Sequence, residues 1–455
     1  YLNQVGGQDE LVFDGASFVL NADRSLAVQL PAWRETVALT EWTKSNHGWV
    51  CARGEIAKLS EGPASAYHAC MLGLKDYVDK NGFPGVVLGL SGGIDSALVA
   101  AIAVDALGPA RVHAIMLPSK YTSDDSLEDA AACAKALGIR YDKISIEPAV
   151  AGLTWGLKDL FAGTNADITE ENLQSRVRGT ILMAVSNKFG GMVVTTGNKS
   201  EMSVGYATLY GDMNGGFNPI KDLYKTEVYA LARWRNEHRP DGAFGPAGIV
   251  IPERIITKAP TAELRANQTD QDSLPPYEVL DDILRCLVEG EMPLADIVAR
   301  GHAPEVVKKV ERLLTIAEYK RRQAAPGVKV TLRGFFNFRP YWDRARLRLN
   351  DIMARFKIDL RASAFRSVLG FTLTHWRRQP WRLSLIMGGF LLSTLADVLT
   401  PLYSGRLVDA VASSAGADAI AWNAAMTAFF ILMALALTGV VLRNLAFMGI
   451  VELTL

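Results

Sequence analysis

Apolar runs alternate with helical patterns through the middle of the chain, from residue 85 to about residue 326. Continuous apolar runs predict strands at 85–90, 111–117, 140–146 and 192–196, because a strand covered on both faces loses the alternation of a half-buried one. Helical patterns follow at 95–107, 126–137, 169–189, 225–235 and within 277–322. This order is typical of an α/β fold with a doubly wound parallel sheet and a helical tail.

The two ends of the chain differ from this middle part. Residues 1–28 alternate loosely and predict short strands, and residues 29–84 predict a polar connector followed by a helix over 65–81. Residues 383–405 carry a single charge, that of Asp397, and residues 420–442 carry none. Because about 20 mostly apolar residues cross the hydrocarbon core of a bilayer, we expect two transmembrane helices here.

The composition of the chain indicates which partners and which redox compartment to expect. Among 455 residues, 48 Lys and Arg balance 48 Asp and Glu, so the net charge of zero does not favour nucleic acid as a partner. The cysteines Cys51, Cys70, Cys133 and Cys286 are far apart and form no CxxC pair, which argues against a zinc site or a disulfide framework. We therefore expect a reduced, cytoplasmic setting for the folded part.

The most informative segment is Ser91-Gly92-Gly93-Ile94-Asp95-Ser96, which follows an expected buried strand and opens an expected helix. Glycines let the backbone approach a ligand closely, and the N–H groups of the turn and of the helix start bind anions. The serines add hydroxyl donors, and a carboxylate at the helix start can hold Mg²⁺. The order of strand, loop and helix favours a phosphate-binding loop over a plain tight turn with a capping Asp.

The S-G-G-x-D-S pattern differs from the G-x-x-x-x-G-K-[ST] loop of kinases and GTPases. It resembles the pyrophosphatase loop of the adenine nucleotide α-hydrolase-like superfamily, whose members cleave ATP between the α and β phosphates and transfer AMP. Similar loops occur in tRNA thiolases, GMP synthetases and asparagine synthetases. The loop therefore predicts a reaction class and leaves the substrate open.

Further motifs indicate which of these families, and therefore which substrate, the chain resembles. In order, they are Asn-Leu-Gln-Ser-Arg-Val-Arg-Gly at 172–179, Thr-Thr-Gly-Asn-Lys-Ser-Glu at 195–201, Tyr-Gly-Asp at 210–212, Asn-Pro-Ile-Lys at 218–221, Lys-Thr at 225–226, Lys-Ala-Pro-Thr-Ala-Glu-Leu at 258–264 and Tyr-Lys-Arg-Arg-Gln at 319–323. Together they resemble the synthetase domain of NAD synthetases, to which we assign residues 85–331. The motifs at 199–201 and 319–322 favour this family over a GMP-synthetase-like ligase, which stays the alternative.

The resemblance implies an amide-forming ligase. In the family, ATP adenylates the nicotinate carboxylate of deamido-NAD, and ammonia then displaces AMP and leaves the amide. It implies no covalent catalytic residue, because positioning and electrostatic stabilisation suffice. The implied ATP-binding residues are Gly89, Leu90, Ser91, Gly92, Gly93, Ile94, Asp95, Ser96, Thr196, Lys225 and Thr261. The implied deamido-NAD residues are Asn172, Glu201 and Lys320, and the implied Mg²⁺ ligands are Asp95 and Glu201.

Two interpretations of Arg176 and Arg178 stay open: contact with the substrate phosphates, or ion pairing on the surface of the 169–189 helix. In the family the deamido-NAD site lies at a dimer interface, so we expect a homodimer to which the 169–189 helix contributes.

The N-terminal residues point to the type of NAD synthetase. Residues 3–15 resemble the last strands of the nitrilase-like glutaminase domain of glutamine-dependent members, so residues 1–28 are interpreted as a remnant of that domain. The Glu, Lys and Cys of a glutaminase site would lie upstream of Tyr1, which we take to be a cut end. Cys51, after His47-Gly-Trp-Val, does not resemble the glutaminase nucleophile. We therefore expect a parent enzyme that uses glutamine and a chain that uses free ammonia.

The family resemblance ends near Thr331. Residues 332–365 predict a basic junction, and residues 366–455 resemble the start of the type 1 transmembrane domain of ABC exporters. The basic lead-in, Arg366 to Arg382, faces the cytoplasm by the positive-inside rule. Two spans without a Walker loop cannot transport, so we interpret this part as a fragment of a membrane transport subunit joined to the ligase. A surface-bound basic linker is the alternative for 327–365. The ligase domain is then expected to be cytoplasmic and membrane-anchored by 383–442.

Overall fold

The computed structural model describes residues 1–45, 48–266, 268–334, 380–413 and 419–454. The chain divides into two compact units, Tyr1–Arg344 and Ala345–Leu455, and each is described by itself.

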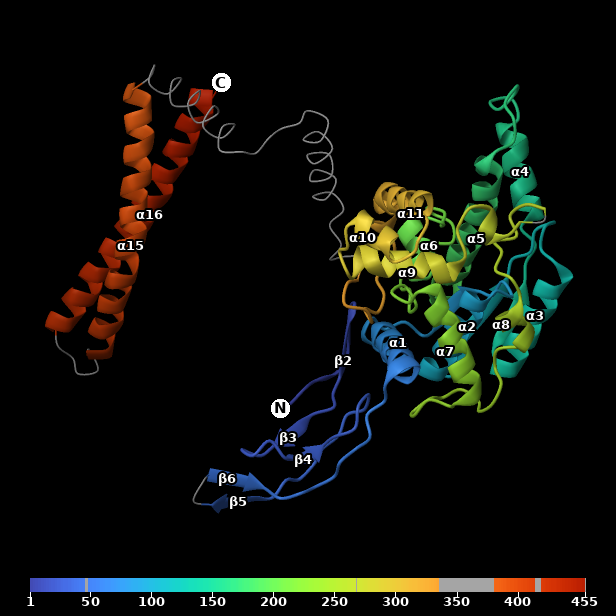
Figure 1. The fold of residues 1–455 in the computed structure, drawn as a ribbon, viewed down its shortest axis with the longest axis horizontal. Coiled ribbons are helices and arrows are strands. Elements are labelled where there is room, and N and C mark those ends of the chain that lie inside the picture. Colours follow the sequence, from blue (N-terminus) through green and yellow to red (C-terminus); the bar gives the residue numbers. More distant parts are fainter. Residues whose placement is uncertain (46–47, 267, 335–379, 414–418, 455) are drawn as a thin grey trace. The chain divides into compact units, whose positions relative to one another are not determined.

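A four-stranded parallel sheet forms the centre of the first unit (Figure 1). Its strands lie in the order β10-β7-β8-β9 and comprise β7 (Val86–Gly89), β8 (Val112–Met116), β9 (Arg140–Lys143) and β10 (Met192–Val193). All three pairings are parallel, as predicted. Helix α2 (Ile94–Leu107) connects β7 to β8, and helix α3 (Asp124–Leu137) connects β8 to β9. The four strands that the apolar runs predicted are thus confirmed, with β9 and β10 shorter than expected.

The sheet is covered on both faces, which explains the unbroken apolar runs. Val86 and Leu88 of β7 belong to the main core cluster, together with residues of α1 (Gly62–Lys80), α2 and α7 (Lys225–Glu237). Val87 points the other way, as strand geometry requires, into a second cluster with side chains of α5 (Ile168–Phe189). Helices on both faces of a parallel sheet make the fold doubly wound.

The helical tail is divided into four helices: α9 (Tyr277–Val288), α10 (Leu294–Ala299), α11 (Pro304–Ile316) and α12 (Glu318–Arg321). Pro293 and Gly301, with φ +106°, stand at the breaks. Shorter elements connect the rest: α6 (Lys199–Val204), α8 (Glu253–Thr257), and the single turns at Pro109–Arg111 and Asp270–Asp272.

The N-terminal residues form two antiparallel hairpins, β1 (Val5–Gln8) with β2 (Leu11–Asp14), and β3 (Phe18–Leu20) with β4 (Leu26–Gln29). The expected short strands are therefore confirmed. The first hairpin is tied to α1, because the Gly7 N–H donates to Asp76 Oδ2 (2.8 Å) and Lys80 Nζ donates to the Gly7 carbonyl (2.7 Å).

The sequence patterns missed several elements, among them a hairpin and a helix that are largely exposed. The expected polar connector contains a hairpin, β5 (Trp42–Ser45) with β6 (Gly48–Cys51), and helix α4 (Glu147–Leu157) precedes α5. All four residues of β5 are exposed, and α4 buries none of its residues. Neither element therefore shows the one-sided apolar pattern from which strands and helices are predicted.

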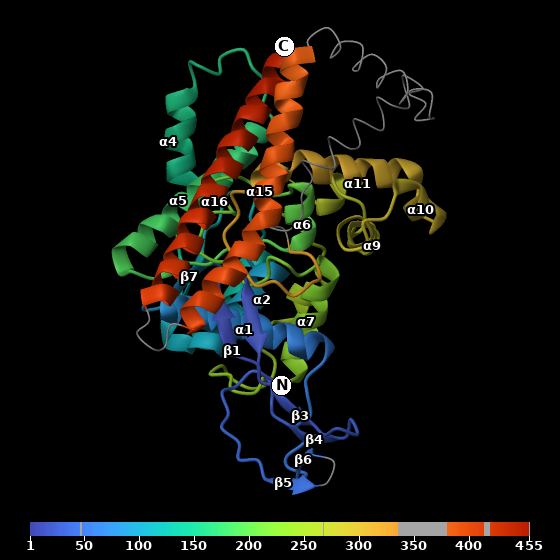
Figure 2. The same ribbon diagram turned by 90° about the vertical axis from the view of Figure 1, so that its left-hand side faces the viewer.

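The second unit contains α15 (Pro380–Ser413) and α16 (Ala419–Thr454), which run side by side in both views (Figures 1 and 2). Within them, Ile386–Asp409 and Ala425–Leu445 are long and apolar enough to cross a membrane by length and composition. Asp397 of the first span pairs with Arg443, and Ser393 Oγ donates to the Gly439 carbonyl (3.2 Å). Most of the expected junction and lead-in, residues 335–379, lies outside the described residues.

Candidate active site

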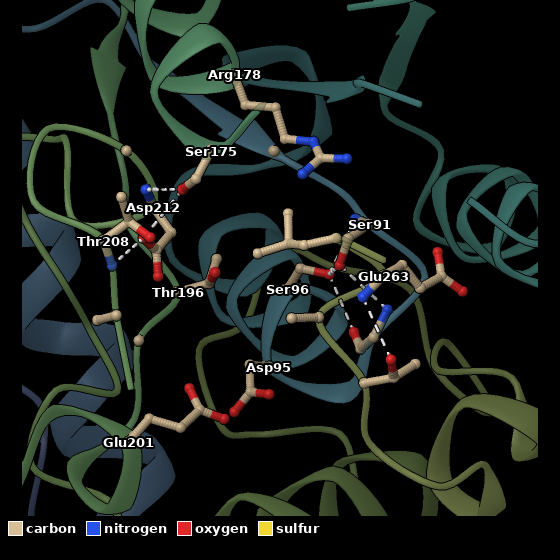
Figure 3. A pocket seen from close by; sticks show the side chains of 18 of the residues that line it. Ser91, Asp95, Ser96, Ser175, Arg178, Thr196, Glu201, Thr208, Asp212 and Glu263 are labelled. Carbon is tan, nitrogen blue, oxygen red and sulfur yellow. Dashed lines mark hydrogen bonds between the residues drawn. The ribbon is translucent and has the colours of Figure 1, made fainter. Parts of the chain in front are cut away.

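A cavity of about 380 Å³ opens at the carboxyl ends of β7 and β8, where ligands bind in open α/β sheets (Figure 3). Every residue that the sequence predicted for ATP, deamido-NAD or Mg²⁺ binding lines this one cavity. The structure thus brings together side chains from α2, α5, α6, α7 and α12 and from the segment 258–270. Which ligand each of them binds stays a prediction.

The loop after β7 is folded by its own hydrogen bonds. Ser96 Oγ accepts from the Ser91 N–H (3.2 Å) and donates to the Gly93 carbonyl (3.0 Å), while Ser91 Oγ accepts from the Gly93 N–H (3.3 Å). Gly92 has φ +80°, and a Cβ there would lie 2.4 Å from the Ser126 carbonyl oxygen. Helix α2 has no side-chain cap at Gly93. The first turn of α2 lines the cavity, and the N–H groups of a helix start without a side-chain cap are able to bind an anion.

Beside this loop, one ammonium group joins two carboxylates. Lys225 Nζ lies 2.5 Å from Asp95 Oδ2 and 3.0 Å from Glu201 Oε1, and the lysine side chain is 2 % exposed. Figure 3 shows the carboxylates of Asp95 and Glu201 turned toward each other. Two carboxylates that share one cation are a suitable donor set for a hard divalent ion. The residues predicted for Mg²⁺ therefore fit that ion in type and placement.

Burial governs the charge states of this group. It raises the pKa of Glu201 to about 7, against the lowering effect of Lys225. Burial by itself would lower the pKa of Lys225, but the nearby carboxylates of Asp95 and Glu201 outweigh it and raise that pKa above its usual value. The lysine is thus firmly charged, while burial disfavours the charged form of Glu201.

On the other side of the loop lies a second polar cluster, which the sequence reasoning did not assign. Lys258 Nζ donates to Ser126 Oγ (2.6 Å) and lies 3.6 Å from Glu263 Oε1, and Glu263 also accepts from Ser123 Oγ and Ser126 Oγ, each at 2.8 Å. Glu263 adopts φ +48°, a strained value for this residue. Lys258 and Glu263 belong to the Lys-Ala-Pro-Thr-Ala-Glu-Leu motif at 258–264. Their serine partners lie more than 130 residues away in sequence.

Two of the residues predicted for deamido-NAD, Asn172 and Lys320, lie on the α5 and α12 side of the cavity. Asn172 Oδ1 accepts from Thr208 Oγ1 (2.9 Å), and Lys320 Nζ donates to the carbonyls of Gly205 (2.8 Å) and Ala207 (2.7 Å). Burial lowers the pKa of Lys320. Both side chains are therefore held in place by the 205–208 turn.

The two arginines of α5 differ in placement. Arg178 extends into the cavity (Figure 3), donates from Nε to the Leu117 carbonyl (3.0 Å), and has its pKa lowered by burial. Arg176 is exposed, donates to the Leu209 carbonyl (3.2 Å), and does not line the cavity. Of the two arginines, Arg178 is the one that lines the cavity.

Two residues of the motifs at 199–201 and 319–322 support the site without lining the cavity. Lys199 is fully buried and pairs with Asp222 (2.8 Å) and Glu289 (2.6 Å). Arg321 donates to the carbonyls of Ser203 and Leu314. These cations fix α6, and with it Glu201, against the helical tail.

The fold and the loop define an α/β protein with a glycine- and serine-rich turn at the carboxyl edge of a parallel sheet. The NAD synthase family matches residues 66–324, more than half of the chain. The chain belongs to the NAD synthase family. The matched region begins within α1, upstream of the 85–331 domain expected from the motifs.

Several relatives of this chain are glutamine-dependent NAD(+) synthetases. The chain is 57% identical over 342 residues to a glutamine-dependent NAD(+) synthetase of Rhodobacter capsulatus, covering 75% of this chain and 62% of the relative. It is 53% identical over 345 residues to the corresponding protein of Xanthomonas campestris, covering 75% and 60%. The chain thus spans about three fifths of the length of these relatives.

Solved structures agree with the fold. A glutamine-dependent NAD⁺ synthetase from Acinetobacter baumannii, in complex with ADP, matches with a TM-score of 0.54 and 48% identity, covering 74% of this chain and 59% of that one. A glutamine-dependent NAD(+) synthetase from Cytophaga hutchinsonii matches with a TM-score of 0.57 at 22% identity, covering 74% and 60%, and supports the fold alone.

Proposed function

We propose that this chain forms the amide of NAD. ATP adenylates the nicotinate carboxylate of deamido-NAD, whose oxygen attacks the α-phosphorus while pyrophosphate leaves. Ammonia then attacks the acyl carbon of the adenylate, and AMP leaves with the C–O electron pair. The observation that carries the proposal is the shared cavity of the Ser91–Ser96 loop and the Asp95–Glu201 pair, in a chain of the NAD synthase family.

The geometry suggests how the residues divide this work. The N–H groups of the loop and of α2 would bind the pyrophosphate leaving group, with Thr196, Lys225 and Thr261 on the rest of ATP. Asp95 and Glu201 would hold Mg²⁺, which neutralises phosphate charge when bound. Asn172, Glu201 and Lys320 would bind deamido-NAD. Arg178 adds a buried guanidinium within reach of negative charge on either substrate.

We propose that this chain uses ammonia as the nitrogen donor of the reaction, and that the longer parent enzyme uses glutamine. The longer relatives are glutamine-dependent NAD(+) synthetases, which supports glutamine use in the parent enzyme. Cys51, the cysteine nearest the glutaminase-like residues, is 2% exposed and its thiol donates to the Ala52 carbonyl. A buried, hydrogen-bonded thiol of this kind is unsuited to act as a nucleophile.

The test is a product assay on the full chain. With deamido-NAD, ATP, Mg²⁺ and ammonium, we expect NAD and AMP in equal amounts. Xanthosine monophosphate in place of deamido-NAD separates this function from a GMP-synthetase-like ligase and is expected to release no AMP. Glutamine in ammonia-free buffer is expected to give no NAD. Failure to form NAD with ammonium would refute the proposal.

We further propose a homodimer formed through the arm made by α4 and the start of α5. The large apolar side chains Leu153, Trp155, Leu160 and Ile168 are all exposed there, Trp155 to 81%. A cluster of exposed apolar residues on a protruding element marks an interaction surface. A second copy of the chain would supply the missing cover, in agreement with the dimer that the family resemblance implies.

The second unit is proposed to be a membrane anchor derived from the start of an exporter transmembrane domain. Its two candidate spans and their contact through Asp397 and Arg443 support insertion as a helical pair. We propose no contribution of this unit to the reaction. The ligase domain would remain cytoplasmic.

A further inference from the structure

Lys225 lies where a divalent cation would bind. Its Nζ is 2.5 Å from Asp95 Oδ2 and 3.0 Å from Glu201 Oε1. Oxygen ligands hold Mg²⁺ at about 2.0–2.1 Å, so an ion bound by the same two oxygens would overlap the ammonium. Like charge adds to this conflict, because both occupants are cations in a buried site. The two carboxylates can therefore hold one cation or the other.

We propose that Lys225 is the resident counter-ion of the Asp95–Glu201 pair, which a divalent cation displaces when it binds. This inference rests on the proposed function, because it assigns Mg²⁺ to that pair. The ammonium neutralises the buried carboxylates while no metal is present. Displacement then turns it toward the cavity that it already lines, next to the anion-binding loop.

The exchange needs only a side-chain movement. The backbone at Lys225 is fixed, since its N–H donates to Ser200 Oγ (2.8 Å) and the following N–H, of Thr226, donates to Asp281 Oδ2 (2.9 Å). Beyond this anchor the four-carbon stem of the lysine has several rotatable bonds. The Lys225 ammonium lies over the Tyr277 ring, with Nζ 5.2 Å from the ring centroid, and this contact leaves the stem free to rotate.

The charge balance favours the exchange, and bound phosphate favours it further. When both carboxylates are ionised, they and the ammonium sum to one negative charge, and replacing the ammonium by a divalent ion makes the group neutral. The displaced ammonium then needs a new anion, which ATP phosphates on the Ser91–Ser96 loop would supply. Divalent binding and nucleotide binding are therefore coupled through Lys225.

The direct test measures Mn²⁺ binding to the nucleotide-free full chain in detergent, by electron paramagnetic resonance. Lys225→Gln removes the competing charge and is expected to bind Mn²⁺ at least about tenfold more tightly than the native chain. Lys225→Arg keeps the charge and is expected to bind as weakly as the native chain. Equal or weaker binding by Lys225→Gln would overturn the proposal.

Lys258→Gln is the matched control. It removes one positive charge from the same cavity, but Lys258 is held by Ser123, Ser126 and Glu263, away from the metal pair. We expect its Mn²⁺ affinity to stay within about threefold of native. An increase as large as that of Lys225→Gln would show a general charge effect and refute the exchange.

A measurement on the native chain tests the same proposal without relying on the folding of any variant. Acetylation by acetic anhydride, followed by peptide mass spectrometry, reports how accessible each lysine is. Mg²⁺ alone is expected to raise the Lys225 acetylation rate several-fold and to leave that of Lys258 unchanged. Unchanged protection of Lys225 at saturating Mg²⁺ would contradict displacement.

The outcomes also separate this inference from the proposed function. NAD formation by the native chain, together with unchanged Mn²⁺ affinity in Lys225→Gln, would overturn the exchange and leave the ligase assignment standing. Tighter Mn²⁺ binding in a chain that forms no NAD would support the exchange at this carboxylate pair and overturn the ligase assignment.

Discussion

Asn198 holds Asp95 directly: its Nδ2 donates to Asp95 Oδ1 at 2.8 Å. The Oδ1 of the same amide accepts from the backbone N–H of Glu201 at 3.0 Å and so caps α6. The orientation of the amide follows from its partners, because a carboxylate needs a donor and an N–H needs an acceptor. One buried side chain thus positions both carboxylates of the proposed metal pair.

Asn198→Asp is expected to lower kcat at least about tenfold, because a hydrogen bond to a charged group contributes about 1.5–3 kcal/mol. Aspartate still caps a helix, but it places a third carboxylate against Asp95. Asn198→Ser keeps a cap without adding charge and is expected to be less impaired. Steady-state kinetics with deamido-NAD and ammonium would measure both, and a more active Asp variant than Ser variant would contradict the positioning role.

Asp95→Asn is expected to reduce turnover much more than stability. The amide keeps the shape of the side chain, and Lys225 keeps its pairing with Glu201, so we expect the melting temperature to fall by only a few degrees, roughly the effect of 1 kcal/mol. Loss of a metal-binding carboxylate is expected to lower kcat by about 100-fold. Glu201→Gln should behave alike. Near-native turnover of either variant at saturating Mg²⁺ would refute the metal assignment.

Gly92→Ala is expected to abolish nucleotide binding. The positive φ of Gly92 costs alanine about 1–2 kcal/mol, and the added Cβ would meet the Ser126 backbone. Gly138→Ala is the control, because Gly138 has a similar φ of +70° at the end of α3 with nothing within 4 Å. Both variants should melt earlier than the native chain, but only Gly92→Ala should lose ATP binding in calorimetry. Native affinity in Gly92→Ala would contradict the loop assignment.

Trp155→Glu is expected to convert a dimer of the first unit into a monomer, since it places a charge in the exposed apolar cluster of the α4 arm. Light scattering on residues 1–344, a unit that is compact by itself, would measure the mass. Phe244→Glu is the control, because Phe244 is 60% exposed on a loop outside the arm. A monomeric native protein with full activity would contradict the dimer.

Removal of residues 345–455 is expected to yield soluble protein with unchanged or higher specific activity. The boundary is that between the two compact units, and the proposed site residues all lie in the first. NAD formation per milligram of catalytic unit is the measurement. Circular dichroism should first show that the shortened chain is folded, since loss of activity in a folded chain would mean that the second unit contributes to the site.

The sequence alone determined the sheet, the loop and the location of the site. Buried parallel strands are visible as apolar runs, and the loop is visible because its glycines and serines are consecutive residues whose backbone requirements are local. The strand-to-helix order then places such a loop at the carboxyl edge of the sheet. For this reason the motif residues, predicted one by one, line a single cavity.

Tertiary structure decided which charges meet. Lys225 lies 130 residues from Asp95 in sequence, and Lys258 lies 132 residues from Ser126. A single sequence does not show which of its distant residues meet in the fold. The motif therefore predicts phosphate binding by Lys225, and the pairing of Lys225 with Asp95 and Glu201 is visible only in the structure. The same limit applies to α4 and β5, whose exposed residues follow no core pattern. Local backbone preference is encoded residue by residue, whereas the pairing of buried charges depends on which segments the completed fold brings together.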